Sequence, residues 1–287
     1  MSEPILSVRN LTVQFGAFRA IDNLSFDLFP GQKLAIVGES GSGKSVTALS
    51  IMKLVQLGTR AEIASGEILF RQDDGQVIDL LRTPEPEMRK IRGNRISMIF
   101  QEPLTSLNPV HTTGDQVVEA IQLHQNKDRA SAYAHALEMF KQVRIPRPEK
   151  VLNDFPHQLS GGMRQRVMIA MALSCDPSVL IADEPTTALD VTIQAQILGL
   201  MRELQEQSGA AVMMITHDMG VVAEFADDIV VMRNSRLIET GSVFDIFDAP
   251  KEAYTKALLA SVPRLGSMTG RDNPDAFDLI EVPEDAK

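Results

Sequence analysis

Cysteine is almost absent from this chain, because Cys175 is the only one among its 287 residues. A single thiol can form neither an intrachain disulfide nor the cysteine-rich ligand set of a zinc site or an iron–sulfur cluster. The sequence therefore excludes a disulfide-stapled fold, and it favours a reducing compartment such as the cytoplasm.

Long apolar runs and an excess of basic residues are missing as well. No stretch reaches the roughly eighteen consecutive apolar residues of a membrane span, and the first residues lack the basic and apolar segments of a signal peptide. We therefore expect neither, so any membrane contact would come through a partner. The formal net charge is −10, which disfavours nucleic acid as the main partner, because that binding depends on lysine and arginine neutralising phosphates.

What the chain does contain is a glycine-rich segment between a short apolar run at 34–37 and a helical pattern from 46 to 54. Residues 38–45, GESGSGKS, match the pattern G-x-x-x-x-G-K-[ST] at this predicted strand-to-helix turn. The glycines allow successive backbone N–H groups to form an anion nest, and the helix dipole adds positive potential. Lys44 can reach the β- and γ-phosphates, while Ser45 can ligate Mg²⁺. The candidate ATP-binding residues of this segment are Gly38, Glu39, Ser40, Gly41, Ser42, Gly43, Lys44, Ser45, Val46 and Thr47.

Polar side chains follow three apolar runs that are predicted to be core strands. They are Gln101, the pair Asp183 and Glu184, and His217. The carboxyl ends of such strands form the ligand-binding edge of an α/β sheet. There Asp183 can hold Mg²⁺ through water, and Glu184 can orient or deprotonate an attacking water. Gln101 either ligates Mg²⁺ or holds the attacking water, or it is an ordinary strand-terminal amide. His217 either contacts the γ-phosphate or has a structural role.

A second candidate anion site begins at Ser160, where Ser160, Gly161 and Gly162 open a predicted helix. The serine can cap this helix, and the glycines leave backbone N–H groups open to an anion. The alternative is a simple capped helix. Upstream of the glycine-rich segment, Phe15 either stacks on an adenine ring or packs within a strand.

The order of elements predicts an α/β fold with a mainly parallel sheet and an N-terminal antiparallel β subdomain. We expect an inserted helical subdomain over about 102–175, with Asp128 as one helix cap, and a C-terminal tail or linker over 264–287. Further strands are predicted over 66–70, 96–100, 178–184, 211–215, 228–232 and 236–240. Further helices are predicted over 84–92, 114–143, 191–207, 243–247 and 252–261.

Taken together, these motifs resemble those of an ABC transporter ATPase, a P-loop NTPase, across about residues 5–263. In order, they match the Walker A segment, Q-loop, signature, Walker B strand, D-loop and H-loop of that family, which lie at Gly38 to Ser45, Gln101, Leu159 to Gln165, Val179 to Glu184, Ala188 to Asp190, and His217. The resemblance implies ATP hydrolysis with Mg²⁺ held by Ser45, Gln101 and Asp183, and with Glu184, His217 and Gln101 in catalysis. It also implies a head-to-tail pair of cassettes, in which Ser160, Gly161, Gly162 and Gln165 face the ATP of the partner cassette and Asp190 marks the D-loop.

Residues 101–109, 160–166 and 254–259 resemble more narrowly the oligopeptide and dipeptide importer group, and 262–268 resembles the stretch between two cassettes in glutathione importers. This implies a peripheral subunit on the cytoplasmic side of the inner membrane, bound to two membrane-spanning permease subunits and served by an extracytoplasmic solute-binding protein. The chain would be complete or the first half of a double cassette. The alternatives are an ABC ATPase for another transported solute, and a non-transport ABC protein acting on DNA or ribosomes.

Overall fold

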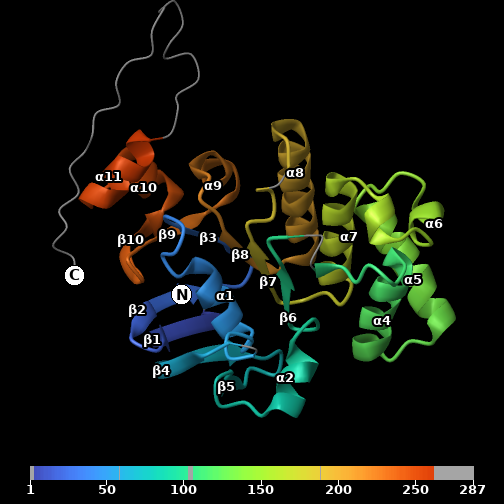
Figure 1. The fold of residues 1–287 in the computed structure, drawn as a ribbon, viewed down its shortest axis with the longest axis horizontal. Coiled ribbons are helices and arrows are strands. Elements are labelled where there is room, and N and C mark those ends of the chain that lie inside the picture. The colour runs from blue at the N-terminus through green and yellow to red at the C-terminus, as the bar shows by residue number, and fades with distance from the viewer. Residues whose placement is uncertain (1–2, 58, 103–105, 188, 262–287) are drawn as a thin grey trace, which may run out of the picture.

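A six-stranded sheet forms the centre of the fold (Figure 1). The computed structural model describes residues 3–57, 59–102, 106–187 and 189–261. Neighbouring strands pair in parallel except for β9 and β10, which are antiparallel. Across the sheet the strands are β10 (Arg236–Ser242), β9 (Asp228–Arg233), β3 (Lys33–Val37), β8 (Ala211–Ile215), β7 (Val179–Asp183) and β6 (Ile96–Ile99). The carboxyl ends of β3, β8, β7 and β6 therefore meet at one edge.

Both faces of this sheet are covered, which explains why its inner strands are continuous apolar runs. On β7, Val179 and Ile181 pack into one hydrophobic cluster, whereas Leu180 and Ala182 pack into another on the opposite face. The first cluster contains α1 (Lys44–Ile51), and the second contains α8 (Val191–Ser208). The alternation is the two-residue period of a strand buried on both sides.

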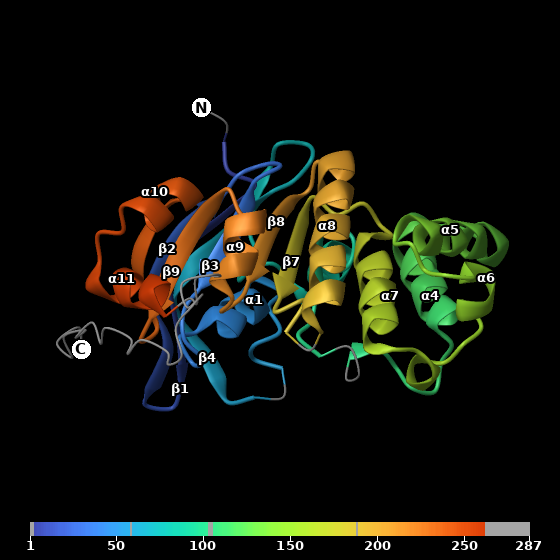
Figure 2. The ribbon, with the colours of Figure 1, turned by 90° about the horizontal axis from the view of Figure 1, so that it is seen from above.

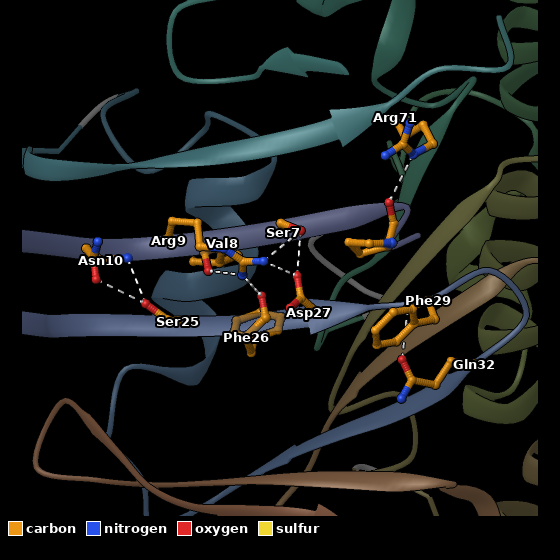
Figure 3. A network of polar contacts seen from close by, with 11 residues as sticks. Ser7, Val8, Arg9, Asn10, Ser25, Phe26, Asp27, Phe29, Gln32 and Arg71 are labelled. Carbon is orange, nitrogen blue, oxygen red and sulfur yellow. Dashed lines mark hydrogen bonds and ion pairs between the residues drawn. The ribbon is translucent and has the colours of Figure 1, made fainter. Parts of the chain in front are cut away.

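An antiparallel four-stranded sheet packs against the α1 side and shares its hydrophobic cluster (Figure 2). Its order is β2 (Phe18–Leu28), β1 (Leu6–Phe15), β4 (Ala61–Arg71) and β5 (Val77–Asp79). Polar side chains also link β1 to β2: Asp27 accepts hydrogen bonds from Ser7 and from Arg9, each across 2.5 Å (Figure 3). Helix α2 (Glu85–Ile91) packs into the same cluster through Met88 and Ile91.

The helices between β6 and β7 gather at one end of the molecule, beyond α8 (Figures 1 and 2). They are α4 (Thr113–Gln125), α5 (Arg129–Gln142), α6 (Pro148–Val151), the short 3₁₀ helix η1 (Pro156–Gln158) and α7 (Gly161–Leu173). The carboxylate of Asp128 accepts a hydrogen bond from the N–H of Ser131, so the predicted cap of α5 is confirmed. The limits 102–175 of the helical subdomain stay a prediction.

At the other end lie α10 (Val243–Asp248) and α11 (Ala253–Ala260), and α9 (Met219–Phe225) lies between them and α8 (Figures 1 and 2). The α/β fold class and the predicted strands and helices are confirmed, except that the predicted helix 114–143 is two helices, α4 and α5. The sequence analysis missed the short elements β5, α6 and η1, and it also missed α9. Its seven residues are too few for a clear helical period, although Asp218 caps it by accepting hydrogen bonds from the N–H groups of Gly220 and Val221. The predicted tail 264–287 lies outside the described residues. Among the described helices, none has the length and apolar content that crossing a bilayer requires.

Candidate functional site

The glycine-rich loop connects β3 to α1 at the carboxyl edge of the sheet. Gly38, Gly41 and Gly43 have φ values of 149°, 82° and 101°, a region that side chains with a Cβ rarely adopt. A Cβ on Gly38 would lie 2.1 Å from the carbonyl oxygen of Met232, and one on Gly43 would lie 2.3 Å from that of Ala20. Two of the three glycines are therefore required both by conformation and by close backbone packing.

Lys44 turns its ammonium group back into this loop. Its Nζ donates hydrogen bonds to the carbonyl oxygens of Gly38 at 2.7 Å and Glu39 at 2.8 Å. Burial lowers the pKa of Lys44, and the charges of Glu184 and Asp183 oppose that shift. The loop therefore holds the Lys44 ammonium group beside the backbone N–H groups that would bind an anion.

Ser45 and Asp183 lie together although 138 positions separate them, with Ser45 Oγ donating to Asp183 Oδ1 across 3.1 Å. Asp183 is 5% exposed, and burial raises the pKa of its carboxyl, while the hydrogen bond from Ser45 lowers it. A hydroxyl and a carboxylate are the hard oxygen donors that Mg²⁺ prefers. This pair therefore fits a magnesium site at the end of the phosphate loop.

Glu184 receives three side-chain contacts, from three different segments. Its Oε2 accepts hydrogen bonds from Gln101 Nε2 at 3.0 Å and Thr187 Oγ1 at 2.9 Å, and its Oε1 lies 3.1 Å from His217 Nδ1. Its φ is 47°, a conformation uncommon for a residue other than glycine, and its N–H donates to the Ile215 carbonyl at 2.8 Å. The structure thus brings Gln101, Glu184 and His217 together, and it adds Thr187, which the sequence analysis missed.

One hollow joins most of these groups. Its lining residues are Phe15, Phe18, Ala20, Ser40, Gly41, Gly43, Lys44, Ser45, Val46, Gln101 and Glu184. Four predicted ATP-binding residues do not line it. Gly38 and Glu39 hold Lys44 through their carbonyls, the Ser42 hydroxyl is buried, and Thr47 is fully buried with Oγ1 donating to the Gly43 carbonyl at 3.0 Å. Their contribution is to shape the loop.

Two aromatic side chains line this hollow, from the end of β1 and the start of β2. Phe15 and Phe18 are cross-strand partners. Phe15 packs partly against the hydrophobic cluster, whereas Phe18 is 61% exposed. Phe15 was predicted as a candidate, but Phe18 was missed. Its position two residues after Gly16 in the same tight turn is the signal that could have found it.

The predicted signature segment forms a second hollow. Ser160 caps α7 through Oγ, which accepts a hydrogen bond from the Met163 N–H at 3.3 Å, and Asp190 caps α8 by accepting from the Ile193 N–H at 3.0 Å. The lining residues are Arg144, Pro146, Ser160, Gly161, Gly162, Met163, Arg166, Leu189, Asp190, Ile193 and Gln196. Gln165 is not among them, because its side chain is buried, at 2% exposure. The two hollows share no lining residue.

Known proteins match this arrangement in sequence. The family described as "ABC transporter" matches residues 21–187, more than half of the chain. The glutathione import ATP-binding protein GsiA is 54% identical over 289 residues in Salmonella paratyphi A and over 287 residues in Escherichia coli O1:K1, covering 99% of this chain in each case. The chain spans 46% of the length of these relatives.

Solved structures match the fold. A dimeric structure of the ATP-binding cassette MJ0796, in a post-hydrolysis state bound to ADP and Pi, has a TM-score of 0.71 and 29% identity, covering 83% of this chain and 98% of that one. CbiO1 of Clostridium perfringens, part of the ABC transporter complex CbiONQ, has a TM-score of 0.71 and 28% identity, covering 86% and 92%. With the phosphate loop and the signature segment both in place, the chain belongs to the ABC transporter family and has the fold of its ATP-binding cassettes.

Proposed function

We propose that this chain binds and hydrolyses ATP as a subunit of an ABC importer for di- and oligopeptides, glutathione or related small solutes. The observation that carries the nucleotide part is the convergence of Lys44, Asp183 and Glu184 around one phosphate loop. The solute class rests on the 54% identity to proteins named for glutathione import.

ATP would lie with its phosphates on the backbone N–H groups of residues 40–46, at the N-terminus of α1. Lys44 would reach the β- and γ-phosphate oxygens from the position that its two carbonyl contacts give to its ammonium group. Phe15 and Phe18 offer ring faces for the adenine, a contact that does not read the identity of the base. These roles agree with the sequence-based assignments and add Phe18.

Mg²⁺, when bound at Ser45 and Asp183 with Gln101 nearby, would neutralise charge on the β- and γ-phosphates. Glu184 accepts a proton from the attacking water, because its carboxylate lines the hollow of the phosphate loop. His217, which contacts the same carboxylate, orients it and reaches toward the γ-phosphate. Thr187 holds the second carboxylate oxygen and so restricts rotation of the base.

The functional unit is proposed to be a pair of cassettes. Ser160, Gly161 and Gly162 do not line the hollow of the phosphate loop in the same chain. They would therefore contact the nucleotide that is bound by a second copy or by a homologous cassette. The dimeric form of MJ0796, at 29% identity, supports this arrangement. Closing and opening of the pair would drive two membrane-spanning permease subunits from the cytoplasmic face of the inner membrane, with an extracytoplasmic solute-binding protein delivering the solute.

The nucleotide part is tested by measuring ATPase activity of the full chain against its own concentration, with and without Mg²⁺. A pair-forming ATPase gives specific activity that rises with protein concentration and requires the metal. Specific activity independent of concentration would contradict the paired site. Lys44→Ala is the matched loss-of-binding variant.

The transport part is tested with the chain and two permease subunits in vesicles. ATPase stimulation by dipeptides, oligopeptides or glutathione in the presence of the binding protein is expected, with a sugar panel as control. Stimulation by sugars alone would point to another transported solute. Failure to copurify any membrane subunit would favour a non-transport ABC protein, although the net charge of −10 disfavours nucleic acid as its target.

A further inference from the structure

Tyr254, on the last described helix, makes a long-range contact with the phosphate loop. The N–H of Glu39 donates a hydrogen bond to the Tyr254 hydroxyl oxygen across 3.1 Å, although 215 positions separate the two residues. The ring is 5% exposed and packs in a hydrophobic cluster with Ala35 and Val37 of β3, the strand that leads into the loop. Helix α11 is therefore packed against β3 and the start of the phosphate loop.

Two charged side chains fix Tyr254 in this place. Glu239 of β10, itself buried, accepts hydrogen bonds from the backbone N–H groups of Lys251 at 2.8 Å and Glu252 at 3.1 Å, which anchors the start of α11. The guanidinium of Arg233, at the end of β9, lies 5.0 Å from the centre of the Tyr254 ring. The hydroxyl is thus held by the sheet through the strands β9 and β10, and it does not depend on the loop for its position.

The peptide group that Tyr254 contacts is also the one that holds the loop lysine. The N–H of Glu39 and the carbonyl of Gly38 belong to the same planar peptide unit. On one side this unit donates to Tyr254, and on the other its oxygen accepts from Lys44 Nζ at 2.7 Å. Because the unit is planar, fixing the N–H direction fixes the carbonyl direction, and with it the position of the ammonium group.

We propose that Tyr254 is a positioning residue for nucleotide binding, whose hydroxyl orients the Gly38–Glu39 peptide and thereby places Lys44 for the phosphates. The proposal rests on the proposed ATP-binding function. It also assigns a role to the segment 254–259, which the sequence analysis used only as a mark of the importer group. Glu184 and His217 follow other strands, β7 and β8, so the hydroxyl acts on binding and leaves the hydrolytic step itself unchanged.

Tyr254→Phe tests this, since it removes the hydroxyl but keeps the ring under Arg233. One neutral hydrogen bond corresponds to about a three- to tenfold change, so KM and Kd for ATP should rise about three- to tenfold while kcat stays near the wild-type value. The chain contains two tyrosines, and Tyr133, 39% exposed on α5, supplies the matched control Tyr133→Phe. A purely structural role would lower the melting temperature without separating KM from kcat.

Backbone hydrogen exchange over residues 34–43 supplies a readout that needs no nucleotide. Exchange should accelerate in the Tyr254→Phe chain and remain unchanged in the Tyr133→Phe chain. Equal protection in all three chains, or ATP affinity of Tyr254→Phe equal to that of the wild type, would overturn the proposal. A wild-type chain that fails to bind ATP would instead refute the proposed function, so the two failures are distinct.

Discussion

Gln101 donates a hydrogen bond from Nε2 to Oε2 of Glu184 across 3.0 Å, joining the ends of β6 and β7. The two strands pair in parallel, with Ile99 opposite Ala182, so both residues emerge at the same sheet edge. Gln101 belongs to the loop that leads into the helical region, and Glu184 is the proposed base. Motion of that loop would therefore act directly on the orientation of the base.

Glu184→Gln is expected to lower kcat for ATP hydrolysis at least about 100-fold, because an amide cannot accept the proton of the attacking water. ATP binding should remain, since Lys44 and the loop backbone are unchanged, and the chain should form a stable pair with ATP. Single-turnover hydrolysis and size-exclusion chromatography measure the two effects. Glu206→Gln, on the exposed side of α8, is the control, and near wild-type turnover in the Glu184 variant would exclude the base assignment.

Asp183→Asn should separate stability from activity. Burial raises the folded-state pKa of Asp183 above its ordinary value. The stabilising contribution of this carboxyl is therefore fully present below its unfolded pKa and is lost as the pH rises through its folded pKa. At neutral pH and without metal, the variant should have a free energy of unfolding equal to or higher than that of the wild type.

The same variant should bind Mg²⁺ about 10- to 100-fold more weakly during ATP hydrolysis, because Asp183 is proposed to hold the ion through water. Urea unfolding in a chelating buffer and a Mg²⁺ titration of ATPase activity measure the two quantities. A variant that is less stable at neutral pH, with unchanged metal dependence, would contradict both assignments.

Phe18→Ala is expected to weaken ATP binding by about 1–3 kcal/mol, the range for stacking of one base on an aromatic ring. Because Phe18 is 61% exposed, its truncation should leave the free energy of unfolding nearly unchanged. Phe15→Ala should lower both the affinity for ATP and the free energy of unfolding, since Phe15 also packs against the hydrophobic cluster. Equilibrium binding and thermal unfolding test this, with Phe244→Ala, 75% exposed on α10, as control; unchanged affinity in Phe18→Ala would show that Phe18 does not contact the base.

Ser160→Gly should reduce the ATPase activity of the cassette pair, because it removes the hydroxyl proposed to contact the partner's nucleotide. The free energy of unfolding should fall by only a few tenths of a kcal/mol, because glycine is a tolerated helix cap. The matched control is Ser242→Gly. Ser242 caps α10 by accepting a hydrogen bond from the Asp245 N–H, and it does not line either hollow. Comparing ATPase activity and melting temperature of the two variants separates capping from nucleotide contact. Equal activity in both variants would leave Ser160 with a capping role alone.

Local features of this chain were predictable from its sequence, because the groups involved are near neighbours. The phosphate loop, the caps at Asp128 and Ser160, and the strand runs of β7 and β8 depend on residues within a few positions of each other. The resemblance to ABC cassettes, given by motif order, is confirmed by the family match. The assignments of individual site residues remain predictions that the variants above test.

Long-range features were not predictable in the same way. The contacts of Gln101 and His217 with Glu184 join residues 83 and 33 positions apart, so no local pattern predicts them. Gln165 follows the signature glycines in sequence and was predicted to face the ATP of a partner cassette. The helical repeat buries its side chain, so it does not line the hollow of the signature segment. Strand pairing places Phe18 beside Phe15, and the turn after β7 places the Thr187 hydroxyl on Glu184.

The sequence by itself determined which chemical groups this protein has: a nest of glycine N–H groups, one loop lysine, two adjacent carboxylates and a second capped helix. Tertiary structure alone decided which of them meet. The order of the strands β3, β8, β7 and β6 brings Gln101, Glu184 and His217 to one edge, and the packing of α11 places Tyr254 on the loop. The physical reason is that these contacts join residues far apart along the chain, so they exist only once the sheet has ordered its strands.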